Sequence, residues 1–157
     1  MDHCRYWKNK YILIIGASSD LCSAMLPVFV DNMGKVGLHY NKNREALRQY
    51  EKRENVKLYQ QDFFEESDFE RIVADFCTWA GGINYLIIMT GNCLNPVNWR
   101  KLNVNDVERD YYINAVVPFM LAKNAIKHMT ESASYEIIAT NGMEAMNDGC
   151  MRGVYSG

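Results

Sequence analysis

The sequence has few of the features that mark metal-binding, disulfide-linked or nucleic-acid-binding proteins. Its five cysteines are odd in number and include no CxxC pair, which argues against a disulfide scaffold or zinc site and favours a reducing compartment. The three histidines share no ligand spacing, so we expect no metal. The net charge is only −2, which gives nucleic acid no electrostatic reason to bind.

Long apolar runs are missing as well. Runs such as Tyr11 to Ile15 are too short to cross a membrane. Residues 1–10 are polar and charged, unlike a signal peptide, and no internal repeat is visible. We therefore expect a polar segment over residues 1–10 and one cytoplasmic domain over residues 11–157, with no membrane or nucleic-acid partner.

The chain does have a buried strand, a turn of small residues and a helix near its start. Tyr11 to Ile15 is typical of a strand buried on both faces, and Gly16 to Asp20 forms the turn. Apolar residues then recur at helical spacing, at Leu21, Met25, Val28 and Phe29. Small side chains and free N–H groups at a helix start suit a diphosphate, so a nucleotide-binding unit is predicted. Any first strand of an α/β domain could look similar.

The rest of the chain alternates between strand and helix. Further strands are expected at residues 35–40, 56–60, 83–89 and 135–139, and helices at 20–33, 44–54, 68–80 and 104–129. We expect Ser67 to cap the third of these helices, with Glu70 completing a capping box. The order predicts an α/β fold, a Rossmann-type doubly wound parallel sheet of about five strands. Ligands of such sheets bind at the carboxyl ends of the strands.

Residues after the second predicted strand bear on the choice of nicotinamide cofactor. Asn41, Lys42 and Arg44 lie there, and no acidic residue precedes Glu45. An acid would bind a ribose 2′-hydroxyl and repel a 2′-phosphate, whereas donors and positive charge favour the phosphate. The segment predicts NADP (NADPH) in preference to NAD, although a solvated loop explains any one of these residues equally well. Asp62, after the third strand, could accept a hydrogen bond from adenine or be a simple turn residue.

Together these motifs resemble the short-chain dehydrogenase/reductase family from Tyr11 onward. The turn Gly16 to Cys22 is similar to the family's TGxxxGxG, with Asp20 and Cys22 at its second and third glycines. Residues 83–91 resemble the strand that ends in NNAG, of which Gly91 is identical. The resemblance implies a cofactor site formed by Gly16, Ser18, Ser19, Leu21, Asn41, Lys42, Arg44, Asp62, Phe63, Thr90 and Gly91.

The resemblance also implies a reaction, hydride transfer between NADPH and a carbonyl or alcohol, as in 3-oxoacyl-carrier-protein reductases or other ketoreductases. Tyr155 would be the acid/base and Asn114 would hold a water in a proton relay. Tyrosine needs a nearby cation because its ordinary pKa is about 10. The family's lysine would lie two residues beyond Gly157, and Gly142 stands where its serine is expected. We therefore expect an inactive fragment that lacks the carboxyl-terminal strands.

Two other functions stay open. A non-catalytic nucleotide- or partner-binding module would explain the altered glycine turn, and a methyltransferase-type fold would explain the turn but neither Asn114 nor Tyr155. Under the reductase interpretation the expected partner is a small carbonyl or alcohol, and pairing with a second copy of the chain is left open. The identity of that substrate is left open.

Overall fold

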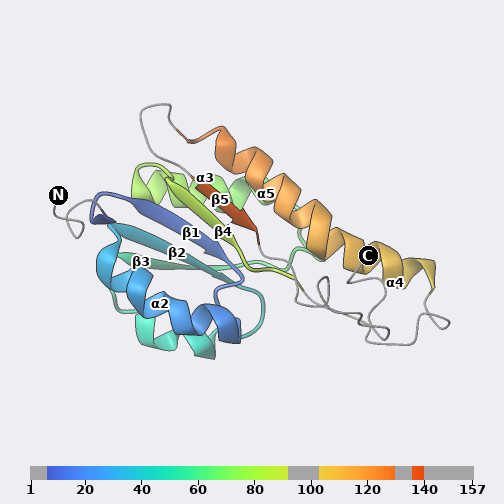
Figure 1. Ribbon diagram of the computed structural model, residues 1–157, viewed down its shortest axis with the longest axis horizontal. Helices are drawn as coiled ribbons and strands as arrows, with labels where there is room; N and C mark the ends of the chain where they lie inside the picture. Colours follow the sequence, from blue (N-terminus) through green and yellow to red (C-terminus); the bar gives the residue numbers. More distant parts are fainter. Residues whose placement is uncertain (1–6, 92–102, 130–135, 140–157) are drawn as a thin grey trace.

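Five strands form one parallel sheet in the computed structural model, which describes residues 7–91, 103–129 and 136–139. The strands are β1 (Tyr11–Ile15), β2 (Lys35–Tyr40), β3 (Val56–Gln60), β4 (Tyr85–Ile88) and β5 (Glu136–Ala139). Their order is β3-β2-β1-β4-β5, and all neighbours are parallel (Figure 1). The expected α/β Rossmann-type sheet is confirmed, and the order reverses direction between β1 and β4.

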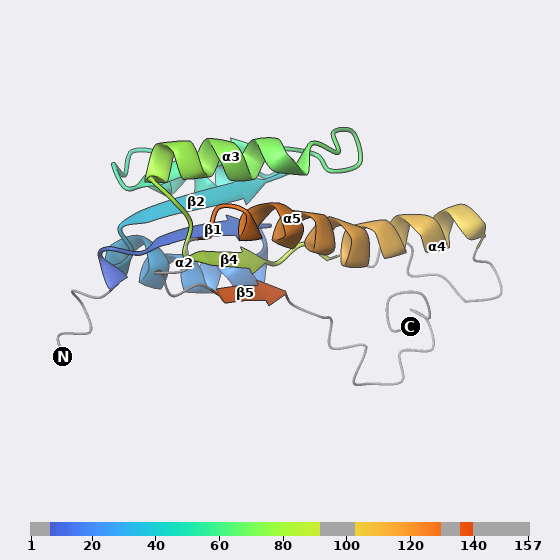
Figure 2. The ribbon, with the colours of Figure 1, turned by 90° about the horizontal axis from the view of Figure 1, so that it is seen from above.

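Helices cover both faces of this sheet (Figures 1 and 2). One face carries α2 (Asp20–Asn32) and the 3-10 helix η1 (Glu45–Tyr50), and the other carries α3 (Phe69–Ala80) and α5 (Val117–Ile126). Alternate residues of β1 serve the two sides: Ile12 and Ile14 belong to one core cluster, Leu13 and Ile15 to the other. Because β1 is buried on both faces, its unbroken apolar run is explained.

Two features position the elements of the sheet and its helices: the hydrogen bonds between Asn84 and Tyr11, and the space that Gly37 leaves for α3. Asn84 binds the start of β1 twice, since its Oδ1 accepts from Tyr11 N at 2.9 Å and its own N–H donates to Tyr11 O at 2.9 Å. Gly37, in the middle of β2, leaves room for the ring of Phe76 on α3. A Cβ at Gly37 would lie 2.6 Å from Phe76 Cδ2 and 2.8 Å from Leu13 Cδ1. Close packing of α3 on the sheet therefore depends on this glycine.

The structure corrects three details of the expected helices. The N-cap of α3 is Asp68, whose side chain accepts from Arg71 N at 3.0 Å, and not Ser67. The segment expected as a helix over 44–54 is the short 3-10 helix η1. On α2 the side chains that face the sheet are Cys22, Leu26 and Val30, whereas Leu21 and Val28 are exposed.

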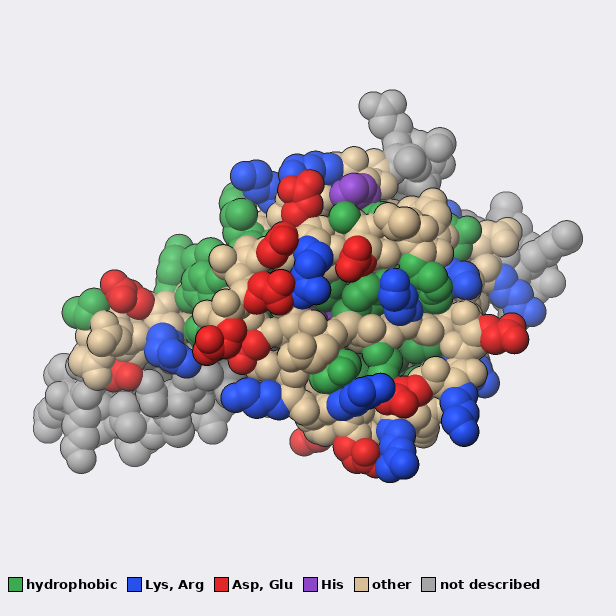
Figure 3. Space-filling model, turned by 180° about the vertical axis from the view of Figure 1, so that it is seen from behind, with side chains coloured by type: hydrophobic (Ala, Val, Ile, Leu, Met, Phe, Trp, Pro, Cys, Tyr) green, Lys and Arg blue, Asp and Glu red, His purple; other side chains and the backbone are tan. Residues whose placement is uncertain are grey.

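The surface carries charges of both signs. In the face shown in Figure 3, lysine and arginine side chains of the described residues alternate with aspartate and glutamate. No helix within the described ranges is long and apolar enough to cross a membrane. Within the same ranges, no three His, Cys, Asp or Glu side chains come together as a metal site.

Candidate functional site at the carboxyl edge of the sheet

The residues predicted to bind a cofactor follow β1, β2, β3 and β4, so the parallel sheet brings them to one edge. The turn 16–19 follows β1, Asn41 and Lys42 follow β2, Asp62 and Phe63 follow β3, and Thr90 and Gly91 follow β4. Since β1 lies between β2 and β4, its turn stands at the reversal of strand order. Open α/β sheets bind ligands at this point.

Gly16 allows the β1 turn to lie against the end of β4. Its φ is +80°, a left-handed conformation that side chains disfavour. A Cβ on Gly16 would lie 2.9 Å from both the carbonyl carbon and oxygen of Met89 and 3.0 Å from Thr90 N. Backbone atoms cannot give way as a flexible side chain can, so this position requires glycine.

The N–H groups of the turn divide into those the protein uses and those it leaves available. Gly16 N donates to His39 Nδ1 at 3.1 Å, and Ala17 N donates to His39 O at 2.8 Å. Ser19 caps α2, because its Oγ accepts from Cys22 N at 3.3 Å. The N–H groups of Ser18, Asp20 and Leu21 have no hydrogen-bond partner in the described part of the chain. Free N–H donors at a helix start are the groups that an anion can bind.

Asp20 places a carboxylate at this same helix start. It is exposed and is the acidic residue of the first turn of α2. Negative charge there stabilises the helix dipole, but it also opposes a bound phosphate. The turn therefore combines three available donors with one unfavourable charge.

His39 is a residue of this edge that the sequence interpretation missed. It is 2% exposed, and its ring lies 4.9 Å from the ring of Phe63 in a stacked arrangement. Its Nδ1 accepts from Gly16 N, so its Nε2 must carry the proton that it donates to Gln61 O at 2.9 Å. Burial lowers the pKa of His39 to about 4, against smaller opposing effects of Gln61 and Asp62. The available signal was a polar residue that follows Val36, Gly37 and Leu38 inside the predicted strand.

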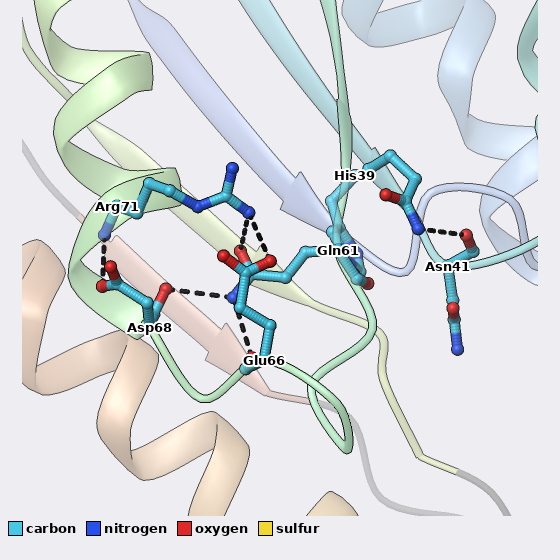
Figure 4. A network of polar contacts seen from close by, with 7 residues as sticks. His39, Asn41, Gln61, Glu66, Asp68 and Arg71 are labelled. Carbon is cyan, nitrogen blue, oxygen red and sulfur yellow. Dashed lines mark hydrogen bonds and ion pairs between the residues drawn. The ribbon is translucent and has the colours of Figure 1, made fainter.

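The end of β3 is held by a network around Gln61 (Figure 4). Gln61 is 1% exposed, and its Nε2 donates to Glu66 O at 3.1 Å and Asp68 O at 3.0 Å. Arg71 Nη2 donates to Gln61 Oε1 at 3.3 Å and to Glu66 Oε2 at 2.8 Å. These bonds fix the loop between β3 and α3, and with it the positions of the two residues after Gln61.

Asp62 is partly engaged in this loop, because its Oδ1 accepts from Phe64 N at 3.0 Å. A carboxylate has acceptor positions left beyond one such bond. Phe63 is 3% exposed and packs between the rings of His39 and Phe69. Asp62 is thus half-buried beside an aromatic wall at the edge of the sheet.

The basic segment after β2 is only partly available to a ligand. Arg44 Nε donates to Glu51 Oε1 at 2.8 Å, which raises the pKa of Arg44 and occupies one side of its guanidinium. Lys42 is exposed and forms no ion pair with any described residue. Asn41 accepts through its backbone oxygen from Gln60 Nε2 at 3.1 Å (Figure 4). Its exposed side chain and that of Lys42 are the donors left for a ligand.

At the end of β4, the hydroxyl of Thr90 is a buried polar atom without a partner among the described residues. A buried hydroxyl without a hydrogen bond is costly, and such atoms often bind a ligand or water. Thr90 adjoins the Gly16 turn, and Gly91 after it is exposed. The edge thus offers a hydroxyl, three N–H donors and a glycine that permits close approach, which fit a nucleotide diphosphate and its ribose.

Asn114 lies where the helix over 104–126 changes its winding. The segment α4 (Val104–Tyr111) passes into a π-helical turn, η3 (Tyr112–Val116), before α5, where a continuous α-helix was expected. Val117 N donates to Tyr112 O, five residues earlier, and Asn114 Nδ2 donates to Asp110 O at 2.9 Å. Such turns occur often at functional sites. Apolar residues at helical spacing predict a buried face that includes Val107, Tyr111 and Ile126, but all three side chains are exposed.

The π-turn is joined to the β3 loop. Tyr112 OH donates to Phe63 O at 3.0 Å, and the rings of Tyr112 and Phe64 lie 5.6 Å apart. Asn114 is therefore connected through Tyr112 to the loop that carries Asp62. Tyr155 and Gly142 lie outside the described residues, so the structure does not place the expected acid/base.

Comparisons with known proteins decide the family. The sequence profile described as short chain dehydrogenase matches residues 10–157. The chain belongs to the short-chain dehydrogenase family, a family of NAD(P)-dependent oxidoreductases. No curated protein matches the sequence.

Solved structures agree with this dehydrogenase fold. An NADH-dependent reductase, A1-R′, complexed with NAD, is 22% identical with a TM-score of 0.82, over 98% of this chain and 68% of that one. ElxO with NADP bound is 18% identical with a TM-score of 0.80, over 94% and 61%. A short-chain dehydrogenase/reductase from Mycobacterium ulcerans is 16% identical with a TM-score of 0.81, over 94% and 56%. The present chain thus spans a little over half to two thirds of their lengths.

Proposed function

We propose that this short-chain dehydrogenase binds NADP(H) at the carboxyl edge of the sheet and belongs to an enzyme that transfers hydride between NADPH and a carbonyl or alcohol. The observation that carries the proposal is the set of free N–H groups at Ser18, Asp20 and Leu21, beside a glycine that permits close approach. The diphosphate would bind these donors. The nicotinamide, when bound, supplies or accepts the hydride.

The remaining cofactor contacts follow from the geometry of the edge. The buried Thr90 hydroxyl would bind a ribose oxygen, and the Asp62 carboxylate would accept from the adenine amine. Ser19 would contribute less directly, because its hydroxyl already caps α2. Of the solved relatives, A1-R′ carries NAD and ElxO carries NADP, so the family accepts both.

NADP is the preferred cofactor in this proposal because of Lys42. The ammonium of Lys42 is exposed and forms no ion pair with a described residue. It can therefore bind a 2′-phosphate without breaking another ion pair, and binding costs only the conformational entropy of the lysine side chain. Asn41 would add an amide donor. Arg44 is a weaker contributor than the sequence implied, since Glu51 already holds its guanidinium.

Tyr155 and Asn114 are the proposed catalytic residues. The π-turn fixes Asn114 by its bond to Asp110 O, and Tyr112 ties that turn to the cofactor edge. A small carbonyl or alcohol is the substrate class.

Calorimetric titration of the chain with NADPH and NADH tests the proposal. Lys42→Ala should weaken NADPH binding about tenfold, the effect of losing one charge-assisted contact, and leave NADH binding unchanged. The matched control is Arg48→Ala, which removes an exposed cation on η1 that pairs with Glu45 at 3.1 Å. It should change neither affinity. Equal losses for both cofactors in Lys42→Ala would overturn the 2′-phosphate assignment.

A non-catalytic binding module is the second candidate, and Asp20 favours it. Its carboxylate at the start of α2 opposes a diphosphate. In the partner-binding form of this alternative, the folded chain would bind neither NADPH nor NADH at millimolar concentration. Binding of either cofactor would exclude the alternative in its partner-binding form.

A further inference from the structure

His39 makes contacts that no part of the proposed chemistry uses. Its backbone oxygen and its Nδ1 accept from two consecutive N–H groups of the β1 turn, Ala17 at 2.8 Å and Gly16 at 3.1 Å. Its Nε2 binds Gln61 O, 22 residues away in sequence, at 2.9 Å. One buried ring thus joins the turn after β1 to the residue before Asp62.

The two ring contacts require one form of the imidazole. Gly16 N–H can only donate and Gln61 O can only accept, so Nδ1 is bare and Nε2 is protonated. The stacked Phe63 ring and the 2% exposure leave little freedom for the ring to rotate. The ring is therefore a fixed brace between two loops.

The two ring hydrogen bonds of His39 set the orientation of the Gly16 turn. His39 draws the N–H groups of Gly16 and Ala17 inward, which leaves those of Ser18, Asp20 and Leu21 as the free donors. Without the Nδ1 bond, Gly16 would be free to use the wide range of backbone conformations open to glycine. Cofactor binding would then have to order the turn, and affinity would fall.

We propose that His39 is a positioning residue for the cofactor, which holds the Gly16 turn through Nδ1 so that the free donors of the turn converge on the diphosphate. This inference rests on the proposed function. The His39 side chain does not itself touch the cofactor. Its bond to Gln61 O fixes the ring, and its bond to Gly16 N transmits that position to the turn.

Two variants separate the two bonds. In His39→Asn, the asparagine Oδ1 lies three covalent bonds from Cα, as the histidine Nδ1 does. This variant therefore keeps an acceptor for Gly16 N–H but loses the donor to Gln61 O. In His39→Gln, the glutamine Nε2 occupies the place of the histidine Nε2. This variant therefore keeps a donor for Gln61 O but loses the acceptor for Gly16 N–H. Each variant loses one ring hydrogen bond and the stacked ring, so the two are matched in stability cost.

Titration with NADPH should distinguish the variants. We expect His39→Asn to bind within about threefold of the wild type and His39→Gln to bind about tenfold more weakly, in line with the loss of one buried hydrogen bond. Thermal unfolding should place both variants at similar midpoints. Affinities that fall together in both variants would show a merely structural role and overturn the proposal.

Amide hydrogen exchange of the cofactor-free proteins provides a second measurement, which does not depend on cofactor binding. Gly16 N–H should exchange faster in His39→Gln than in His39→Asn, since only the first leaves it without an acceptor. Equal exchange would overturn the proposal. A wild-type chain that bound neither NADPH nor NADH would instead refute the proposed function. The exchange rates would still test whether the His39 ring holds Gly16 N–H.

Discussion

Acidification should destabilise this protein through His39, and the size of the effect follows from its burial. The ordinary histidine pKa is about 6.5, and burial lowers the pKa of His39 to about 4 in the folded chain. Between these values the unfolded chain binds a proton that the folded chain does not. The free energy of unfolding therefore falls as the pH falls from about 6.5 to about 4.

The magnitude is large enough to measure. At about 1.4 kcal/mol for each pH unit, the interval between 6.5 and about 4 corresponds to about 3 kcal/mol. A domain of this size has an unfolding free energy of about 5–15 kcal/mol in total. Protonation would also place a second N–H of the ring against Gly16 N–H, and the Gly16 hydrogen bond would be lost. Asp62, the charged residue that acts on His39, opposes the effect.

Urea denaturation at a series of pH values between 7 and 4.5 tests this prediction. The comparison protein is His39→Asn, which keeps an acceptor for Gly16 but has no titrating ring. The other titratable groups are common to both proteins and cancel in the difference. The stability of the wild type relative to the variant should fall by about 1.4 kcal/mol per pH unit below pH 6. A difference that does not change with pH would refute the buried neutral ring.

Three further substitutions test the packing of α3 on the sheet and the packing and charge of the carboxyl edge. Gly37→Ala should lower the free energy of unfolding by about 1–3 kcal/mol in urea, because its Cβ would press on Phe76; an unchanged stability would contradict the packing. Gly16→Ala should abolish NADPH binding in calorimetry, because its Cβ would meet the Met89 backbone, and retained affinity would contradict that contact. Asp20→Asn should tighten binding of NADPH and NADH about threefold by removing a carboxylate from the phosphate site, and weaker binding would contradict that placement.

The strands were largely predictable from the sequence because burial leaves a simple pattern. Residues 11–15, 35–40 and 56–60 form β1, β2 and β3 with the expected bounds. The helix expected to follow Ser67 and to end at Ala80 is α3 (Phe69–Ala80). In each case, one clear pattern of apolar residues matched one buried surface.

Helix α2 shows where pattern alone was insufficient. It has apolar residues on most of its circumference, so two sets share helical spacing. Helical spacing predicts the set Leu21, Met25 and Val28, while the sheet buries Cys22, Leu26 and Val30. The orientation is set by the Ser19 cap and the short turn before it, which are features of the fold and not of periodicity.

The gathering of the candidate cofactor residues at one edge of the sheet was predictable, but the contacts among them were not. Small and polar residues after successive strands identified the carboxyl edge, and the sheet order brings them together. The role of His39 depends on contacts with Gly16 and Gln61, more than 20 residues away in each direction. The π-turn at Asn114 and the Arg44–Glu51 pair likewise arise from side-chain geometry that local sequence does not encode.

The central claim is that the carboxyl edge of β1 to β4 is the NADP(H) site, and amide chemical shifts measured during NADPH titration test it most directly. The account predicts saturable shifts at Ser18, Asp20 and Leu21, with further shifts at Lys42 and Thr90. The chemical shifts of amides at the opposite edge of the sheet should not change. Saturable shifts confined to other surfaces, or none in a folded chain at millimolar NADPH, would contradict the account.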